Sequence, residues 1–413
     1  MPDHAPRRFG ALSEPSYRLF LGGFGFSYTL YWVTLLAVGW WMWEVTQSAA
    51  WVGFVFFCDL FPGVLVTPWA AAIADRGNRF RLLKGILWIQ VFTGLALAAT
   101  AWAGLLTPWS LCAFVFLEGA LIGFSQPAFF GMINRLVRPE NLSAAVSLNI
   151  TVTNGSYIVG PVLAAYVFSY GLGIAPLAFA ANALGTVVYL ACLARVTLGP
   201  EPAREAREPT ELLRDILEGM STFFTNPTVS RAIILILGAA MLQRPLISLM
   251  PGINDRFDLF AAHNFTYLTA SFMMGSITAS LRHAHRNSDA GLARSTPRVM
   301  ALLALGTIGF FWAMQAMAFQ GWAALACLYL IGVATTYVLA GNNVILQNRT
   351  PEHLRSRVLG NSFMLSRTIG ALAVIGVGFV TEVSDFSPAF MLNAALVLVA
   401  ALWLLLRRPL QRQ

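Results

Sequence analysis

The feature that most constrains this chain is a series of long, almost uninterrupted apolar stretches. A helix needs about 20 apolar residues to cross the hydrocarbon core of a bilayer. We expect spans at residues 18–42, 50–74, 82–105, 109–133, 143–169, 173–195, 230–251, 262–281, 298–318, 322–346, 357–381 and 387–406. A membrane β-barrel would show short alternating segments instead. The sequence therefore predicts an all-α membrane protein with twelve transmembrane helices.

Composition agrees with this prediction. Of the 413 residues, 57% are hydrophobic and 11% are charged, whereas about 25% of a soluble domain is charged. The four cysteines lie singly in apolar stretches, which indicates small buried side chains rather than a disulfide framework or a metal site. The first twenty residues lack the apolar core and cleavage site of a signal peptide, so we expect insertion through the spans themselves.

The basic residues predict the orientation. Arg and Lys cluster before the first span, in the central linker and after the even-numbered spans, whereas Arg256 is the only basic residue in the loops on the other side. Since loops rich in basic residues stay in the cytoplasm, we expect both termini to be cytoplasmic. The net charge of +8 then reflects topology, and no nucleic-acid partner is expected. The predicted location is the bacterial inner membrane.

A short internal repeat indicates that the chain consists of two related halves. RPENLSAAVSLN at 138–149 and TPEHLRSRVLGN at 350–361 align at a constant offset of 212 residues. Each block joins the fourth and fifth predicted spans of its half. Two similar six-span bundles that face each other imply a central cavity whose two ends open alternately.

A polar stretch near the midpoint separates these halves. We therefore expect an amino-terminal six-helix bundle at 1–195, a cytoplasmic linker at 196–228 and a carboxy-terminal six-helix bundle at 229–413. Apolar residues between Leu212 and Phe224 recur on one face of a helix. They fit either an interfacial helix lying on the bilayer or an extension of the seventh span.

The loop after the second span carries a specific motif. AAIADRGNRFRLLK at 71–84 resembles the cytoplasmic signature of the major facilitator superfamily, in which Asp-Arg and further basic residues follow the second span. The matching residues are Asp75, Arg76, Arg79 and Arg81, while Ala71 and Asn78 stand where the superfamily usually has Gly. The resemblance implies a cytoplasmic gate in which charge-assisted hydrogen bonds bias a two-state element. The alternative is ordinary anchoring of a positive loop.

A second motif lies in the fifth span. In NGSYIVGPVLAAYV at 154–167, Ser156, Gly160 and Pro161 resemble the small-residue Gly-Pro motif of superfamily antiporters, although Ser and Ala occupy positions where Gly is typical. Small residues let two helices approach closely, and Pro bends a helix. The motif therefore indicates either antiport or simple tight packing.

The resemblance extends over nearly the whole chain. RFGALSEPSYRLFLGG near the start and FSQPAFFGMINRLVRPENLSAA are similar to the branch with enterobactin-type siderophore exporters, macrolide efflux proteins and lysophospholipid transporters. This implies a transporter of a small amphipathic molecule, siderophore-like or drug-like, in a lipid bilayer. We expect a monomer with no resident cofactor or metal.

Four charged residues near the middle of predicted spans are candidates for function. Asp59 and Glu118 lie eight and nine residues beyond a tryptophan, which places both carboxylates about 12–14 Å inward if those tryptophans mark the outer interface. Arg244 and Arg367 bring positive charge to the seventh and eleventh spans. Each charge at the bilayer centre costs about 2.5–3.5 kcal/mol, so we expect all four to face the cavity.

We hypothesise that Asp59 or Glu118 is the protonation site that couples proton movement to transport, with Arg244 and Arg367 as substrate or switching partners. The alternative is a structural salt bridge across the halves. Uncharged polar residues of the spans either line the cavity or form hydrogen bonds between helices: Gln126, Asn154, Asn342 and Asn343.

The predicted function is proton-coupled export by alternating access. Import of a siderophore or metabolite and transport of a lysophospholipid are the alternatives, because gradients decide direction. A membrane-embedded acyl-transfer enzyme would need a nucleophile or a His/Asp pair near an interface. The five histidines lie in loops, at a span edge or at the terminus, so we expect no enzymatic activity.

Overall fold

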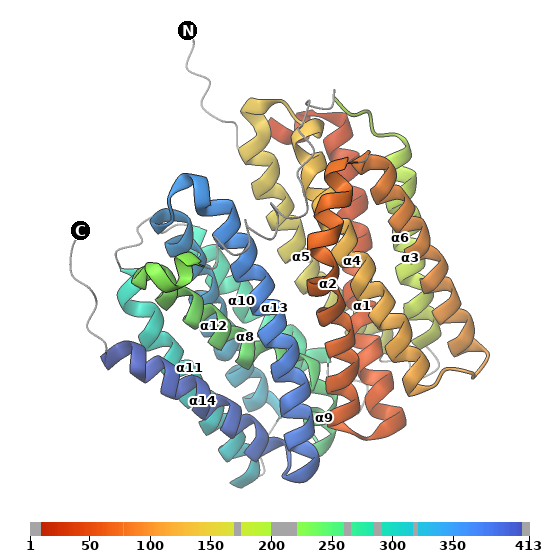
Figure 1. The fold of residues 1–413 in the computed structure, drawn as a ribbon. Helices are drawn as coiled ribbons and strands as arrows, with labels where there is room; N and C mark the ends of the chain where they lie inside the picture. The colour runs from red at the N-terminus through yellow and green to blue at the C-terminus, as the bar shows by residue number, and fades with distance from the viewer. Residues whose placement is uncertain are drawn as a thin grey trace. The chain divides into compact units, whose positions relative to one another are not determined.

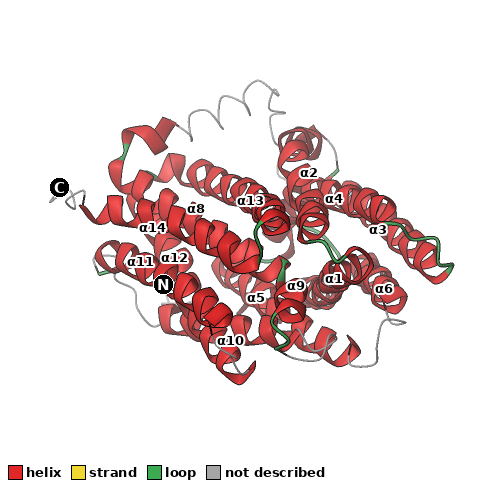
Figure 2. Cartoon of the chain, turned by 90° about the horizontal axis from the view of Figure 1, so that it is seen from below, coloured by secondary structure: helices red, strands yellow, loops and turns green. Residues whose placement is uncertain are grey.

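The computed structural model describes residues 10–76, 78–168, 175–199, 221–259, 266–284, 291–316 and 321–406. Every regular element in these ranges is a helix (Figure 1), and the colouring by secondary structure in Figure 2 contains no strand within them. The prediction of an all-α fold is confirmed. The expected interfacial helix of the linker falls largely on 200–220, outside the described residues.

The helices of the first half are α1 (Pro15–Thr46), α2 (Ala49–Arg76), α3 (Arg79–Trp102), α4 (Pro108–Leu136), α5 (Leu142–Phe168) and α6 (Ala175–Ala194). Those of the second half are α8 (Pro227–Ser248), α9 (Met250–Arg256), α10 (Thr266–Ala284), α11 (Leu292–Ala316), α12 (Gly321–Arg349), α13 (Glu352–Val383) and α14 (Phe386–Leu406). Among the described residues, ten helices are long and apolar enough to cross a membrane. α5 and α10 coincide with two further predicted spans, and the total of twelve stays a prediction.

Local sequence explains where several helices begin. Asn78 and Asn226 precede α3 and α8, and each side-chain oxygen accepts two backbone N–H groups of the first helical turn. Thr107 and Ser110 form a reciprocal capping box at the start of α4, where Pro108 is the first helical residue. These interactions satisfy N–H groups that have no partner within the helix.

The seventh predicted span, about 230–251, agrees with α8 within a few residues, but the sequence did not predict a break in the helix near its end. α8 stops at Ser248, and the short helix α9 starts at Met250 after a break at Leu249. Pro251 has no N–H to continue the ladder of hydrogen bonds, so the chain begins a new helix with Pro near its start.

The offset of 212 residues relates complete helices, not just the short repeat. Shifted by this offset, the bounds of α4 become 320–348 and those of α6 become 387–406, within one residue of α12 and α14. The shifted start of α1, 227, coincides with the start of α8. Packing repeats too: α3 packs on α4 and α6, and its counterpart α11 packs on α12 and α14. The fold therefore consists of two related halves, as the short repeat predicts.

The structure divides into two compact units. Unit 1 comprises residues 1–41 and 62–212, and unit 2 comprises 42–61 and 213–413. Unit 2 thus contains the end of α1 and the start of α2 as well as the second-half helices. The domain limits proposed above, 1–195 and 229–413, stay predictions.

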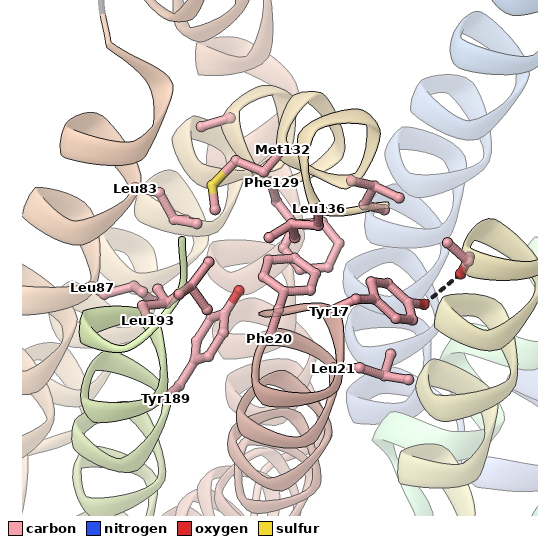
Figure 3. Close-up of a cluster of buried hydrophobic side chains, with 14 of the residues drawn as sticks. Tyr17, Phe20, Leu21, Leu83, Leu87, Phe129, Met132, Leu136, Tyr189 and Leu193 are labelled. Atoms are coloured by element: carbon pink, nitrogen blue, oxygen red, sulfur yellow. Dashed lines mark hydrogen bonds between the residues drawn. The ribbon is translucent and has the colours of Figure 1, made fainter. Parts of the chain in front are cut away.

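The core of unit 1 joins five helices. Tyr17 and Phe20 of α1, Phe129 of α4 and Tyr189 of α6 pack together, and the Tyr17 hydroxyl donates to the Ala145 carbonyl of α5 at 2.6 Å (Figure 3). α3 contributes further buried leucines to the same cluster.

The core of unit 2 contains counterparts of the same positions. Shifted by 212 residues, positions 17, 20 and 21 become Val229, Ala232 and Ile233, all buried in one cluster with Ile345 of α12. The repeat therefore preserves positions that pack, while the residue types at these positions differ.

Candidate transport site

Asp59 lies deep in unit 2, where its side chain is only 4% exposed. Two close contacts between α2 and α13 show which residue of α13 lies at the same height along the helix axes as Asp59. A Cβ atom on Gly53 would lie 2.8 Å from the Val374 carbonyl oxygen, and one on Gly378 would lie 2.6 Å from that of Ala49. The two helices are therefore antiparallel, with Ala49 opposite Gly378 and Gly53 opposite Val374. Because both rise by about 1.5 Å per residue, this register places Asp59 level with position 368, next to Arg367.

Arg244 of α8 approaches the same part of α13. A Cβ atom on Gly370 would lie 2.7 Å from its Cγ, so the stem of this arginine lies along the α13 backbone. Arg367 is half-buried, and its guanidinium carbon lies 5.9 Å from the centre of the Phe363 ring. Unit 2 thus brings Asp59, Arg244 and Arg367 to similar levels along α13.

The residue after Arg244 is a proline inside α8. Pro245 has no N–H to donate to the carbonyl of Met241, one turn earlier. Asn393 of α14 supplies the missing donor, because its Nδ2 donates to that carbonyl at 2.8 Å. A buried amide thereby satisfies the carbonyl that Pro245 leaves without a partner within the helix, beside Arg244.

Glu118 has a different environment, in unit 1. Thr93 Oγ1 donates to Glu118 Oε1, and Gln90 Nε2 donates to Glu118 Oε2 at 3.1 Å. Gln90 and Thr93 are three residues apart and therefore share one face of α3. Both carboxylate oxygens accept hydrogen bonds from uncharged side chains of the neighbouring helix.

An aromatic cluster lies near the middle of α1 and α5, also in unit 1. The Tyr28 ring stacks on Tyr31 at 5.7 Å and meets Trp32 and Tyr157 edge-on, while Trp32 and Tyr157 lie 4.3 Å apart. The three tyrosines are only half-buried. We call Tyr28, Tyr31, Trp32 and Tyr157 the aromatic seam.

The family model of the Major Facilitator Superfamily matches residues 19–375. The chain belongs to the Major Facilitator Superfamily. The family expected from the Asp-Arg loop is therefore confirmed, and with it a multi-pass membrane protein of a family of small-molecule transporters.

Two relatives that the chain resembles are distant in sequence. The chain is 23% identical over 353 residues to the Staphyloferrin A transporter of Staphylococcus aureus strain NCTC 8325 / PS 47, covering 83% of this chain and 82% of the relative. It is 23% identical over 247 residues to macrolide efflux protein A of Streptococcus pyogenes, covering 60% of each.

Solved structures of other family members share the fold. A bacterial homologue of the human lysosomal transporter Spinster, in an inward-facing and occupied conformation, matches with a TM-score of 0.73 at 13% identity over 95% of this chain and 96% of that one. A D-xylose–proton symporter matches with a TM-score of 0.72 at 13% identity over 96% and 97%. At such identities the likeness shows the fold alone.

The residues of the family's loop motif are described in part. Asp75 and Arg76 lie in the last turn of α2, and their side chains fall outside the described part of the structure. Arg79 begins α3, where its side chain lies against Gly131 of α4 so closely that a Cβ atom there would meet it. Arg81 is exposed. The gate role of these four residues stays a prediction.

The Gly-Pro motif of α5 lies against α1. The Ser156 hydroxyl accepts a hydrogen bond from Thr29 at 3.1 Å, and a Cβ atom on Gly160 would collide with Trp32. Pro161 is buried inside α5. The small residues therefore let two helices touch directly beside the aromatic seam, whether or not the chain is an antiporter.

The uncharged candidates occupy varied environments. Asn342 is buried, donates to the Val338 carbonyl at 2.7 Å and accepts from Thr296 of α11 at 3.5 Å, so it links α12 to α11. Gln126 is half-buried, and Asn343 is exposed. The side chain of Asn154 lies outside the described residues.

Sequence reasoning missed three sets of residues around these candidates. They are Gln90 and Thr93 beside Glu118, Asn393 beside the Met241 carbonyl of α8, and the aromatic seam. The spacing of the tyrosines on α1 would have indicated a shared helix face, but no local pattern links them to α5.

Proposed function

We propose that this chain is a proton-coupled exporter of a small amphipathic molecule, siderophore-like or drug-like, which works by alternating access in the bacterial inner membrane. The observation that carries the proposal is the buried Asp59 at the level of Arg367 and Arg244 in unit 2. A membrane helix bears the cost of such charges where they serve an ion or substrate pathway.

Asp59 is the proposed coupling residue. Export against a gradient by proton exchange requires that the proton and the cargo compete for one site. A carboxylate meets this requirement when a donor group of the cargo, such as an ammonium or hydroxyl, occupies the oxygens that otherwise hold the proton. Glu118 is the second candidate, because Thr93 and Gln90 already occupy one hydrogen-bonding direction on each of its oxygens.

The two arginines are the proposed contacts for an acceptor or anionic group of the cargo. A guanidinium presents several N–H donors in a fixed plane and stays charged at every physiological pH. In unit 1 the aromatic seam is the proposed surface for apolar contacts, since aromatic rings bury a large area and tyrosine keeps a polar group at its edge.

The relatives suggest which cargoes to test. One is a transporter of staphyloferrin A and another is a macrolide efflux protein, so a siderophore and a macrolide represent the two proposed cargo classes. The low identity leaves the cargo of this chain to experiment.

The proposal is tested by flux in proteoliposomes that contain the purified full-length chain. Probes are iron-55-loaded staphyloferrin A and a radiolabelled macrolide, with a pH difference imposed in either direction. We expect movement of at least one probe opposite to the proton flow, which a protonophore abolishes. Movement of a probe in the direction of proton flow would instead support import, and movement unaffected by the protonophore would contradict proton coupling.

A further inference from the structure

One face of α11 carries two charges that the proposed transport site does not use. Arg294 and Arg298 lie one helical turn apart near the start of α11, and both side chains are exposed. Leu302, Leu305 and Trp312 continue the same face at helical spacing, and each is at least half exposed. An exposed apolar face of a membrane-spanning helix contacts lipid, so the two arginines border lipid as well.

The opposite face of α11 is the one that packs inside unit 2. Thr296 of this face donates to Asn342 of α12, and the Phe311 ring stacks on a ring of α14 at 4.4 Å. The methyl group of Met300 lies so close to Gly238 of α8 that a Cβ atom there would be 2.6 Å away. These contacts fix the rotation of α11 and therefore the outward direction of the arginine face.

The helix α3 of unit 1 has an exposed face with the same spacing. Steps of four, three and seven residues join Trp88, Phe92, Leu95 and Trp102 in α3, and Arg298, Leu302, Leu305 and Trp312 in α11. The seven apolar side chains are 49–68% exposed. The offset between these faces is 210 residues (298 − 88), two fewer than that of the short repeat. At the same place on its lipid-facing side, α11 thus has an arginine where α3 has a tryptophan.

Arg298 lies deeper than a loop residue. It precedes Trp312 by 14 residues (312 − 298), which corresponds to a rise of about 21 Å. The hydrocarbon core is about 30 Å thick, so Arg298 lies inside its cytoplasmic boundary if Trp312 marks the outer interface. A charge that borders lipid at this depth is costly unless it reaches the headgroup layer or a group of opposite charge.

Both arginines can reach that layer. Side chains of a helix lean toward its amino terminus, and α11 starts on the predicted cytoplasmic side. Arg294 lies one turn, about 6 Å, nearer to the headgroups, so the two guanidinium groups can converge on one phosphate. Within the described part of the chain, neither forms an ion pair with a carboxylate. The planar N–H groups of arginine match the oxygens of a phosphate.

The positive charge of cytoplasmic loops does not explain this pair. In α3, the position that matches Arg294 is Lys84 (294 − 210), which is partly buried with its ammonium 4.4 Å from the centre of the Phe80 ring. The same face of α3 therefore has one charge with an aromatic partner, whereas α11 has two charges that border lipid.

We propose that Arg294 and Arg298 bind the phosphate of an anionic phospholipid, whose acyl chains lie along Leu302 and Leu305. A zwitterionic lipid binds less well, because its own ammonium group competes for the phosphate, whereas an anionic headgroup leaves a net charge for the two arginines. The site includes neither Asp59 nor the aromatic seam. Its lipid preference is therefore independent of the proposed transport function.

Photo-crosslinking locates the lipid. A benzoylphenylalanine photoprobe replaces Leu302, and in the matched control it replaces Phe92, the residue of α3 at the same spacing. Nanodiscs contain equal amounts of phosphatidylglycerol and phosphatidylcholine. We expect the probe at position 302 to capture phosphatidylglycerol about tenfold more than phosphatidylcholine, since each basic residue near a membrane surface contributes about 1 kcal/mol. The probe at position 92 should capture the two lipids nearly equally.

Substitution of the arginines then tests their role. Arg298→Gln should bring the capture ratio at position 302 close to that of the control, and Arg298→Lys, which keeps the charge without the planar N–H groups, should retain part of the preference. Arg355→Gln removes an exposed arginine of α13 and should leave the ratio unchanged. Equal capture of both lipids at position 302, or an undiminished preference in Arg298→Gln, would overturn the proposal.

Thermal unfolding in detergent provides a second measurement. A ligand that binds only the folded protein raises its melting temperature. Added phosphatidylglycerol should therefore raise the melting temperature of the purified protein more than phosphatidylcholine does, and the double variant Arg294→Gln/Arg298→Gln should lose this difference. An identical difference in the double variant would contradict binding by the arginines. Neither experiment measures cargo, so their failure would leave the proposed function standing.

Discussion

Asp59 and Glu118 are two acids in membrane-spanning helices, and the structure places them in different chemical environments. Glu118 accepts hydrogen bonds from Thr93 and Gln90 of its neighbouring helix α3 in unit 1. Asp59 is almost fully buried in unit 2 at the level of Arg367 and close to that of Arg244. The two hydrogen-bond donors to Glu118 are uncharged, whereas Asp59 shares its level along α13 with the arginine at position 367. From these environments we predict that Asp59 serves coupling and that Glu118 acts mainly in helix packing, with Glu118 as the coupling residue if Asp59 is excluded.

The largest effect is expected for Asp59→Asn, which keeps the shape of the side chain and removes its ability to carry a proton. Cargo accumulation driven by a pH difference should fall about tenfold or more, the loss of a typical coupling free energy. Exchange of cargo across the bilayer without a pH difference should persist. Full gradient-driven accumulation by this variant would remove Asp59 from the mechanism.

The second-largest effect is expected for substitution of Arg244 and Arg367, the two arginines near the level of Asp59 along α13. Arg244→Gln and Arg367→Gln should each weaken binding of a cargo with an anionic group about tenfold, because a hydrogen bond to a charged group contributes about 1.5–3 kcal/mol. Calorimetric titration of the purified protein measures this directly. Arg298→Gln, in α11 and exposed, serves as control. Equal affinity in all three variants would show that the arginines do not contact cargo.

Glu118→Ala should act mainly on stability. It leaves the donors of Gln90 and Thr93 without this acceptor, which costs about 1–3 kcal/mol and lowers the melting temperature in detergent. Coupled transport should stay within a few-fold of the original, and Glu118→Gln, which keeps an acceptor oxygen, should melt closer to it. Loss of proton coupling in Glu118→Gln at an unchanged melting temperature would reverse the roles assigned to the two acids.

The smallest effect is expected for Thr93→Val, which removes a single hydrogen bond to Glu118. A loss of about 0.5–1.5 kcal/mol in the free energy of unfolding is expected, with transport unchanged. Combining it with Glu118→Ala gives a double-mutant cycle, and the combined loss should be smaller than the sum of the two. A strictly additive result would show that the two side chains do not interact in the membrane.

Much of the fold follows from the sequence, because a sufficiently long apolar stretch predicts a membrane-spanning helix. The span expected at 387–406 differs from α14 by one residue, and the Asp-Arg loop indicated the correct family. The break at Leu249 was missed, since apolar content continues through it and only Pro251 marks the new helix. The sequence therefore predicts that a membrane span exists more reliably than it predicts where the helix ends.

The candidate site was predicted only in part, because its partners come from distant segments. Asp59 and Arg367 attract attention as charges in apolar stretches. Their common level depends on the register of α2 against α13, which close contacts at Gly53 and Gly378 set and no local pattern reveals. Asn393 was missed for the same reason, because its partner Met241 lies 152 residues away.

The most direct test of the central claim is the proton balance of cargo binding, measured by titration calorimetry in buffers of different ionisation enthalpy. If Asp59 exchanges a proton for cargo, the protein should release protons as cargo binds, and Asp59→Asn should bind cargo without any release. Proton uptake on binding, or an undiminished release in Asp59→Asn, would contradict the account.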